Sequence, residues 1–546
     1  IPIYCEEVLP GDTFDVQTNA VVRLQSLLTP IMDNLYLDIS YWFVPMRLTW
    51  EHTKEFFGEN TASAWIPQVT YTMPQVTSPA STGWSVGTLA DHFGIPTGIA
   101  GLSVSALPFR AYSLICNEWW RSENLTDPLN IPVNDSTQTG SNGTNYITDV
   151  VNGGAPFKAA KFHDLFSSAL PSPQKGPDVL LNMADGYAPV VTRDPFVDNS
   201  VLKQGGSYPY YLYWKDPHTL QSPVDVSGQY IAGLRPSNIY DTDEASVVHA
   251  TTAASPLTTA YRASSVGPTT LIPANLYADN SVLPGISINQ FRMAFQIQKF
   301  YERQARSGSR YTEVIKSFFG VTSPDYRLQR PEYLGGKRQA INVNAVTQTS
   351  ASESGLTPQG NQAAYSVTHL SHNDFFKSFT EHGYVIGLAV VRYDHSYQQG
   401  LSKMWSRKTK FDFYWPVFAN LGEQAILNKE IYAQGSSVVD SDGNVIDDQV
   451  FGYQEAWYDY RYPKNLVTGE MRSTYSTSLD VWHLGDDYNS LPQLSDGWIR
   501  EDKANVDRVL AVTSAVSNQL FADFYFKNYV TRPMPVFSIP GLVDHH

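Results

Sequence analysis

Cysteine is almost absent from this chain, since its 546 residues include only Cys5 and Cys116. Two cysteines cannot form the disulfide framework that holds small secreted domains together. The composition therefore favours synthesis in a reducing compartment. Neither cysteine has a histidine near it in sequence, so both are predicted to be small buried side chains rather than nucleophiles.

Long apolar runs and catalytic motifs are also missing. No stretch approaches the roughly 18 apolar residues that cross a bilayer, so no transmembrane segment is expected. The chain has no G-x-S-x-G, P-loop, dinucleotide-binding glycine pattern or H-E-x-x-H. His369 and His372 lie three residues apart, but no further ligand follows at metal-site spacing. The sequence therefore predicts no enzyme activity, no catalytic residue, no metal and no cofactor.

Charge is scarce and unbalanced. Charged residues make up 17% of the chain, and 38 basic residues against 53 acidic ones give a net charge of −15. The sequence pI is near 5.2. An acidic chain of this kind is not a general nucleic-acid binder, so any contact with nucleic acid has to be local.

Turn formers and aromatic residues are abundant. The chain has 33 Tyr, 34 Pro and 36 Gly, and apolar runs are short and broken. This pattern predicts a mainly β protein, a sandwich or jelly roll, with long loops and a few helices. Strands are expected at residues 35–44 (half-buried), 384–394 (buried on both faces) and 410–415, and helices at 107–125, 288–307, 310–319 and 512–520.

Residues 182–284 are rich in Tyr, Ser, Thr and Pro and have little periodicity. A structureless loop of this length is uncommon inside a compact domain. The segment is therefore interpreted as a large excursion with short strands of its own, inserted into the parent fold. We expect residues 1–181 to form the first part of that fold, 182–286 the insertion, and 287–546 the helices, a basic arm, the remaining strands and a C-terminal tail.

Residues 287–338 form a basic stretch within the acidic chain. Ten cations and four anions give this stretch a charge of +6 (10 − 4), so the remainder of the chain carries −21. Phosphate is one natural partner, and solvated ion pairs are the simpler explanation. The candidates for facing DNA or a neighbouring subunit are Arg292, Lys299, Arg303, Arg306 and Arg310. An extended arm is expected at residues 321–337.

Several long segments resemble, in the same order, the major capsid proteins of gokushoviruses, a branch of the microviruses, which are small tailless phages with single-stranded DNA. They read EEVLPGDTF (6–14), YWFVPMRLTW (41–50), LPFRAYSLICNEWWR (107–121), LPSPQKGPDV (170–179), YTEVIKSFFG (311–320), SPDYRLQRPEYLGG (323–336) and the C-terminal NQLFADFYFKNYVTRPMPVFSIPGLVDHH.

The resemblance implies a single eight-stranded antiparallel jelly roll of the viral capsid type. Sixty copies would form a T=1 icosahedral shell around circular single-stranded DNA, with residues 182–286 as a surface protrusion that meets a host receptor. A small basic DNA-packaging protein and a minor pilot protein are the other expected partners. The location would be the virion, after synthesis in the cytoplasm of a host bacterium. Candidate residues for inter-subunit arms are Arg327, Arg330, Tyr333, Arg532 and Phe537.

A second class of function stays open at this point. The two carboxylates of a glycosidase are recognised by their separation in space, which a sequence does not give. Abundant aromatic residues also suit stacking on sugars. A soluble carbohydrate-binding or glycan-hydrolysing β-sandwich is therefore the alternative to the capsid subunit.

Overall fold

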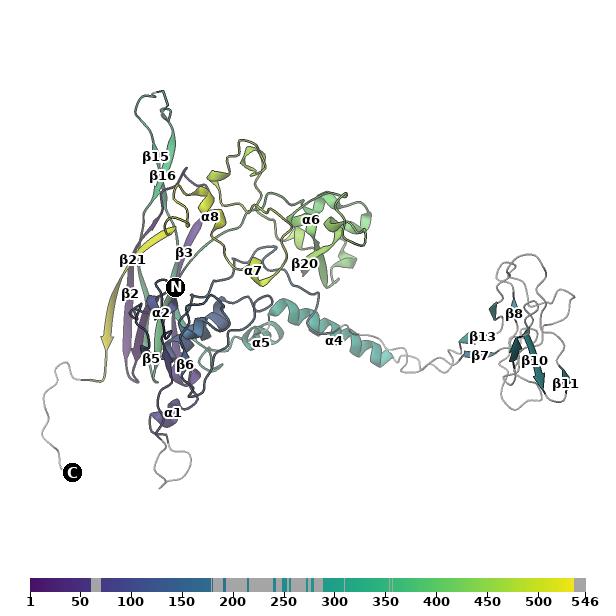
Figure 1. Cartoon of the computed structure of the whole chain (residues 1–546), viewed down its shortest axis with the longest axis horizontal. Coiled ribbons are helices and arrows are strands. Elements are labelled where there is room, and N and C mark those ends of the chain that lie inside the picture. Colours follow the sequence, from purple (N-terminus) through teal and green to yellow (C-terminus); the bar gives the residue numbers. More distant parts are fainter. Residues whose placement is uncertain are drawn as a thin grey trace, which may run out of the picture. The chain divides into compact units, whose positions relative to one another are not determined.

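The computed structural model describes residues 1–59, 70–177, 288–308, 310–352 and 357–534, residues 179, 354 and 355, and several short strands between 190 and 278. The chain divides into two compact units (Figure 1). The first comprises Ile1–Pro177 and Lys299–His546, and the second comprises Asp178–Gln298.

Two antiparallel sheets form the centre of the first unit. The larger sheet has the strand order β1-β18-β3-β14 and the smaller one β17-β2-β21. Their strands are β1 (Pro2–Val8), β2 (Thr13–Leu24), β3 (Leu35–Pro45), β14 (Glu332–Ala340), β17 (Thr368–Ser378), β18 (Gly383–Tyr393) and β21 (Leu520–Thr531).

The main hydrophobic core lies between the inner faces of these two sheets. In β2 every second side chain is buried, from Phe14 and Val16 to Val22 and Leu24. These side chains share one cluster with Leu37 of β3 and others from β18. Period-two alternation places successive side chains on opposite faces of a strand, so the intervening side chains of β2 point away from the core.

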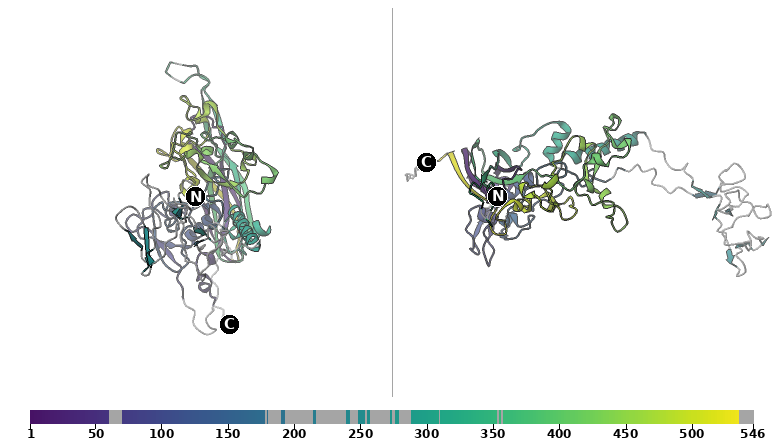
Figure 2. Two further views of the ribbon diagram at one scale, coloured as in Figure 1. Left: turned by 90° about the vertical axis from the view of Figure 1, so that its right-hand side faces the viewer. Right: turned by 90° about the horizontal axis from the view of Figure 1, so that it is seen from above.

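One hairpin connects the two sheets. Strand β14 pairs with β3 in the larger sheet, and β17 pairs with β2 in the smaller one. Between them, β15 (Val343–Thr347) and β16 (Gln362–Ser366) pair with each other. The hairpin projects beyond the sheets (Figure 1, and the left view of Figure 2). The arrangement is mainly β with few helices, as predicted.

A layer of helices and loops covers the outer face of the larger sheet. Trp42 and Val44 of β3 and Ile386 of β18 point to this side and share a second buried cluster with Phe109 and Tyr112 of α3. Helix α3 spans Leu107–Ile115 and ends in a π-helical turn, Cys116–Trp120, so it is shorter than the predicted 107–125. The rest of the layer contains α1 (Thr53–Phe56), β4 (Gln75–Thr77), α2 (Leu89–His92), β5 (Ser103–Ser105) and β6 (Gln138–Thr139).

The prediction that residues 35–44 form a half-buried strand is wrong in one respect, because this layer covers the second face of the strand. The segment is a strand, but it is buried on both faces rather than half-buried, and Asp38 and Ser40 are buried with it. Asp38 accepts hydrogen bonds from Arg338 (2.6 Å) and Arg392 (2.7 Å), which satisfies its carboxylate away from water. The prediction that 384–394 is buried on both faces is confirmed for most of β18.

Two other predicted elements are wrong. Residues 410–412 form a 3₁₀ turn instead of a strand, because the Asp412 carboxylate accepts from the backbone N–H groups of Lys408 and Thr409. Residues 512–519 form turns instead of a helix. Ser514 donates both its backbone N–H and its hydroxyl to Asp507 of α8 (Ala504–Val509), which holds the segment against the preceding helix.

A third buried cluster lies in the C-terminal half of the first unit. It joins β19 (Glu423–Leu427) and β20 (Val450–Glu455), which pair with each other, to α6 (Asn428–Ile431) and to Phe166. Helix α7 (Asp496–Ile499) follows later in the chain.

The second unit holds short two- and three-stranded sheets. The predicted boundaries of the insertion, 182 and 286, lie outside the described residues. The described strands of this unit are β7 (Val190–Thr192), β8 (Trp214–Lys215), β9 (Ile239–Asp241), β10 (Val248–Thr252), β11 (Ser255–Pro256), β12 (Ile272–Pro273) and β13 (Leu276–Ala278).

Candidate assembly surfaces

The basic stretch folds into two helices followed by a strand. Helix α4 (Ile288–Ser307) and helix α5 (Tyr311–Phe319) are close to their predicted bounds. Gly320 closes α5 with φ of +71°, a conformation that glycine adopts without strain. The predicted arm is extended only in part. Residues 325–330 form turns, and β14 joins the larger sheet of its own subunit.

The candidate cations of α4 differ in their surroundings. Arg292 and Lys299 are exposed. Arg303 donates to the backbone carbonyl of Ser317 in α5, and its guanidinium lies 5.1 Å from the Phe318 ring centre. Arg303 therefore links the two helices, whereas Arg292 and Lys299 leave their charges at the surface.

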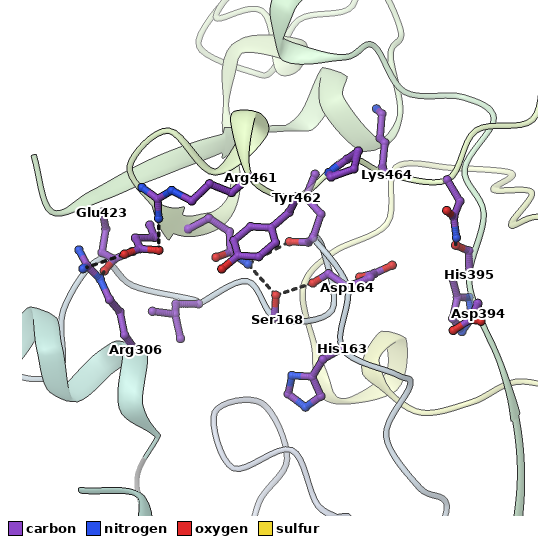
Figure 3. Close-up of a pocket in the computed structure, with 16 residues that line it drawn as sticks. His163, Asp164, Ser168, Arg306, Asp394, His395, Glu423, Arg461, Tyr462 and Lys464 are labelled. Atoms are coloured by element: carbon purple, nitrogen blue, oxygen red, sulfur yellow. Dashed lines mark hydrogen bonds and ion pairs between the residues drawn. The ribbon is translucent and has the colours of Figure 1, made fainter. Parts of the chain in front are cut away.

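Arg306 lines a cavity of about 740 Å³ (Figure 3). It forms ion pairs with Glu423 of β19 and, at 3.3 Å, with Glu455 of β20. The Glu423 side chain is only 1% exposed. Burial raises the pKa of Glu423, and the hydrogen bond and charge of Arg306 oppose that rise. Arg306 thus compensates a buried carboxylate within its own subunit.

Arg310 is fixed even more tightly. Its guanidinium lies 3.3 Å from Glu123 and 3.4 Å from Glu313, and it donates to the backbone carbonyl of Asn117 at 2.7 Å. Half-buried charges with several partners hold local structure together. Of the five candidates, Arg292 and Lys299 are the ones whose charge is available at the surface.

The candidate arm residues are placed as follows. Arg327 is exposed, whereas Arg330 pairs with Asp325 at 2.8 Å. Tyr333 of β14 is 47% exposed. Arg532 donates to Asp12 at 3.1 Å and to the backbone carbonyl of Glu7 at 2.8 Å, which ties the chain after β21 to the start of the fold. Phe537 lies outside the described residues.

An exposed apolar segment that the sequence analysis missed lies at residues 401–421. Its exposed large side chains include Trp405 at 70% and Val417 at 88%. Large contiguous apolar patches on a soluble subunit mark interaction surfaces, and interfaces are enriched in aromatic residues and Met. The complete set is Leu401, Met404, Trp405, Phe411, Phe413, Tyr414, Trp415, Val417 and Leu421.

A signal for this surface is present in the sequence. Residues 411–418 read FDFYWPVF, and five of these eight residues are aromatic. The alternation of Phe411, Phe413 and Trp415 is typical of a strand with one buried face. Pro416 and the cap made by Asp412 prevent the segment from pairing in a sheet.

The buried ionisable groups form a separate network beside the larger sheet. His395 is 2% exposed and donates from Nδ1 to Asp486 at 2.9 Å, while its Nε2 lies 3.4 Å from Glu501. Burial lowers the pKa of His395, but the two carboxylates outweigh burial and raise it to about 9. Lys161 lies 3.8 Å from the same Asp486 carboxylate. These groups stabilise one another inside the subunit.

Histidines and carboxylates of the described residues do not gather into a metal site. His372 instead contacts Asp374 of its own strand at 3.1 Å. Within the part of the chain that the structure describes, no helix is both long and apolar enough to cross a membrane.

A β-rich subunit with a large exposed apolar segment is typical of a structural protein that works as an assembly. Comparison with known proteins defines the family. Residues 1–542 match the family described as "Capsid protein (F protein)" of phages, and the chain belongs to this family.

Three relatives, each named capsid protein VP1, align with 99% of this chain. The protein from Spiroplasma virus 4 is 42% identical over 545 residues and is covered to 92% of its length. Those from Bdellovibrio phage phiMH2K and Chlamydia phage 1 are 39% and 37% identical over 550 and 563 residues, with 91% and 92% of their lengths covered.

The predicted membership among microvirus major capsid proteins is therefore confirmed. The chain is a structural component of a virion. Its family and these relatives are capsid proteins rather than enzymes, which removes the support for a glycan-hydrolysing sandwich.

Proposed function

We propose that sixty copies of this chain assemble into a T=1 icosahedral shell around circular single-stranded DNA, and that apolar segment 401–421 is a contact between copies. The observation that supports the contact is the exposure of nine large apolar side chains in one segment. Exposed apolar surface of this kind is costly in water, and burial against a second copy stabilises it by roughly 25 cal/mol per Å². A closed shell provides such contacts on every subunit.

We also propose that the fold is an eight-stranded jelly roll of the viral capsid type. The two described sheets contribute seven long strands, four in one sheet and three in the other. The β15–β16 hairpin, which continues β14 and β17, is the candidate for completing the barrel. This hairpin connects β14 of the larger sheet to β17 of the smaller sheet, and such a connection between the two sheets supports the jelly-roll topology.

The charge of the chain supports one of the expected partners, the basic packaging protein. At −15 per copy, a shell would repel DNA unless its inner face is locally basic or a separate cationic protein accompanies the DNA. A small basic packaging protein fits this requirement. A pilot protein, and host-receptor contact through residues 182–286, complete the proposal. Arg292 and Lys299 stay candidates for contacts with DNA or a neighbouring copy because they are exposed, and Arg327 stays a candidate for contact with a neighbouring copy for the same reason.

The assembly contact is tested with two matched substitutions of exposed valines. Val417→Asp changes apolar segment 401–421, where Val417 is 88% exposed, and Val86→Asp changes a valine that is 82% exposed outside it. We expect Val417→Asp to reduce the yield of particles by about tenfold or more, because a buried unpaired carboxylate is costly at an interface. Val86→Asp should leave the yield near that of the unchanged protein.

Sedimentation of the purified particles measures the yield, and circular dichroism of the subunit checks that each variant folds. Equal yields for both variants would contradict the assignment of residues 401–421 to an interface between copies. A chain that never forms particles, even unchanged, would contradict the shell itself.

A further inference from the structure

A second cavity, of about 750 Å³, lies apart from the candidate interface at 401–421. It is bounded by the π-helical turn Cys116–Trp120, by α5 and by the chain that leads into β14. Pockets that bind small ligands span roughly 300–1,000 Å³. The cavity is therefore large enough for a ligand of the size of a nucleotide.

The charge of this cavity is opposite to that of the chain. Six cations and three anions line it, which gives +3 (6 − 3) with histidine neutral, in a chain of −15. A local positive potential of this kind attracts anions. The cations are Arg121, Lys161, Arg310, Lys316, Arg330 and Arg392, and the anions are Glu118, Glu313 and Asp325.

Most of these cations are fixed by partners, and one is free among the described residues. Arg330 pairs with Asp325 and donates to Thr312 at 3.2 Å. Lys316 is exposed, and its backbone carbonyl accepts from Gly320, but its side-chain ammonium has no hydrogen bond or ion pair with another described residue. Lys316 is therefore the lining ammonium with donors to spare for an incoming anion.

Aromatic rings form one wall of the cavity. Trp119 contacts Trp42, with ring centres 4.6 Å apart, and the guanidinium of Arg330 lies 4.1 Å from the Trp119 ring centre. Tyr333 stacks obliquely against the same Trp42 at 4.9 Å and remains 47% exposed. The fixed rings hold Tyr333 in place, so its exposed surface is available to a planar ring.

We propose that this cavity binds a nucleotide, with the base stacked on Tyr333 and the phosphate bound by Lys316 in the positive field of the wall. Stacking on aromatic side chains combined with cationic phosphate contacts is the general mode of single-strand binding without sequence preference. The inference rests on the proposed function, because the packaged strand would supply the nucleotide.

The first test uses intact particles. Ultraviolet irradiation followed by tryptic digestion and mass spectrometry locates nucleotide adducts on the protein. We expect an adduct on the peptide of residues 328–337, which contains Tyr333, and none on exposed Trp405 of apolar segment 401–421. Particles that contain DNA but give no adduct on residues 328–337 would overturn this inference and leave the proposed function intact. Particles that contain no nucleic acid would instead contradict the proposed function.

The second test titrates the full-length dissociated subunit with thymidine 5′-monophosphate and follows tryptophan fluorescence. Loss of a charge-assisted contact should raise the dissociation constant of Lys316→Gln about tenfold. Tyr333→Ala should weaken binding as well. Lys408→Gln, which removes an exposed charge outside the cavity, is the matched control and should bind as the unchanged subunit does.

Glucose 1-phosphate and inorganic phosphate distinguish the possible ligands. We expect both to bind more weakly than the nucleotide, because neither presents a planar base to Tyr333. Equal or tighter binding of glucose 1-phosphate would show a sugar-phosphate site and overturn the proposal. If inorganic phosphate binds as tightly as thymidine 5′-monophosphate, the cavity does not recognise the base. If none of the three ligands binds, the proposed site is contradicted altogether.

Discussion

The two sheets of the sandwich share one core but differ in what covers their outer faces. The layer around α3 covers the larger sheet, so neighbouring residues of β3 such as Trp42 and Phe43 are both buried. Among the described residues the outer face of the smaller sheet is bare, and β21 exposes Tyr525 at 63% and Tyr529 at 65% there. Yellow β21 lies beside β2 at one margin of the unit in the right view of Figure 2. Most substitutions in a sheet that is covered on both faces should lower the stability of the subunit. Side chains on a bare face are instead free to make contacts outside the subunit.

Asp38 offers the strongest way to test the covered side. Its side chain is 10% exposed and pairs with Arg392, which is 14% exposed. Asp38→Ala leaves this guanidinium buried without its carboxylate, and breaking such a pair costs about 3–5 kcal/mol. Urea denaturation of the dissociated subunit measures the loss. Arg338→Gln is the control, because Arg338 is 52% exposed and its loss should cost far less.

Neighbouring residues on one strand give a direct comparison of the two sheets. Trp42→Ala and Phe43→Ala should each lower the free energy of unfolding by about 3–5 kcal/mol, because both leave cavities. On β2 only Phe14→Ala should have that effect, while Asp15→Ala on the bare face should stay within about 0.5 kcal/mol. A large loss for Asp15→Ala, or a small one for Trp42→Ala, would break the contrast between the sheets.

The burial of β2 and β18 could be predicted from the sequence, whereas the burial of both faces of β3 could not. The alternation in β2 and the apolar run of β18 report burial directly, because they depend on residues within one strand. Asp38 and Ser40 suggested a solvent-facing side for β3, since nothing local shows that Arg338 and Arg392 reach Asp38 from strands about 300 residues and more away in sequence. Long-range pairs of this kind decide burial without leaving a periodic signal.

The contacts of the candidate assembly residues could not be predicted from the sequence either, because they too depend on long-range pairs. The charge of residues 287–338 is visible in the sequence, but the intramolecular partners of Arg306 and Arg310 are not. The strand predicted at residues 410–415 is wrong, because alternating aromatic residues suit a strand and an exposed turn equally well. What prevents strand pairing there is the local cap of Asp412.

The stability of the subunit should also depend on pH through the buried network of His395, with a smaller effect than that of the core substitutions. His395 has a pKa raised from 6.5 to about 9, so its charged form stabilises the folded state. This contribution is complete below about pH 6.5 and is lost as the pH rises toward 9, by about 2–3 kcal/mol. Urea denaturation at pH 6 and pH 9 measures the difference.

His395→Gln should flatten this dependence. His369→Gln is the matched control, because His369 is exposed on the bare face of β17 and should leave the dependence unchanged. A pH dependence that survives His395→Gln would contradict the role assigned to the buried network.

A reconstruction of purified particles by electron cryomicroscopy tests the central claim most directly. The account predicts a closed shell of sixty copies in which apolar segment 401–421, including Trp405 and Val417, is buried against a neighbouring copy. A shell in which this segment faces solvent, or a protein that remains monomeric, would contradict it.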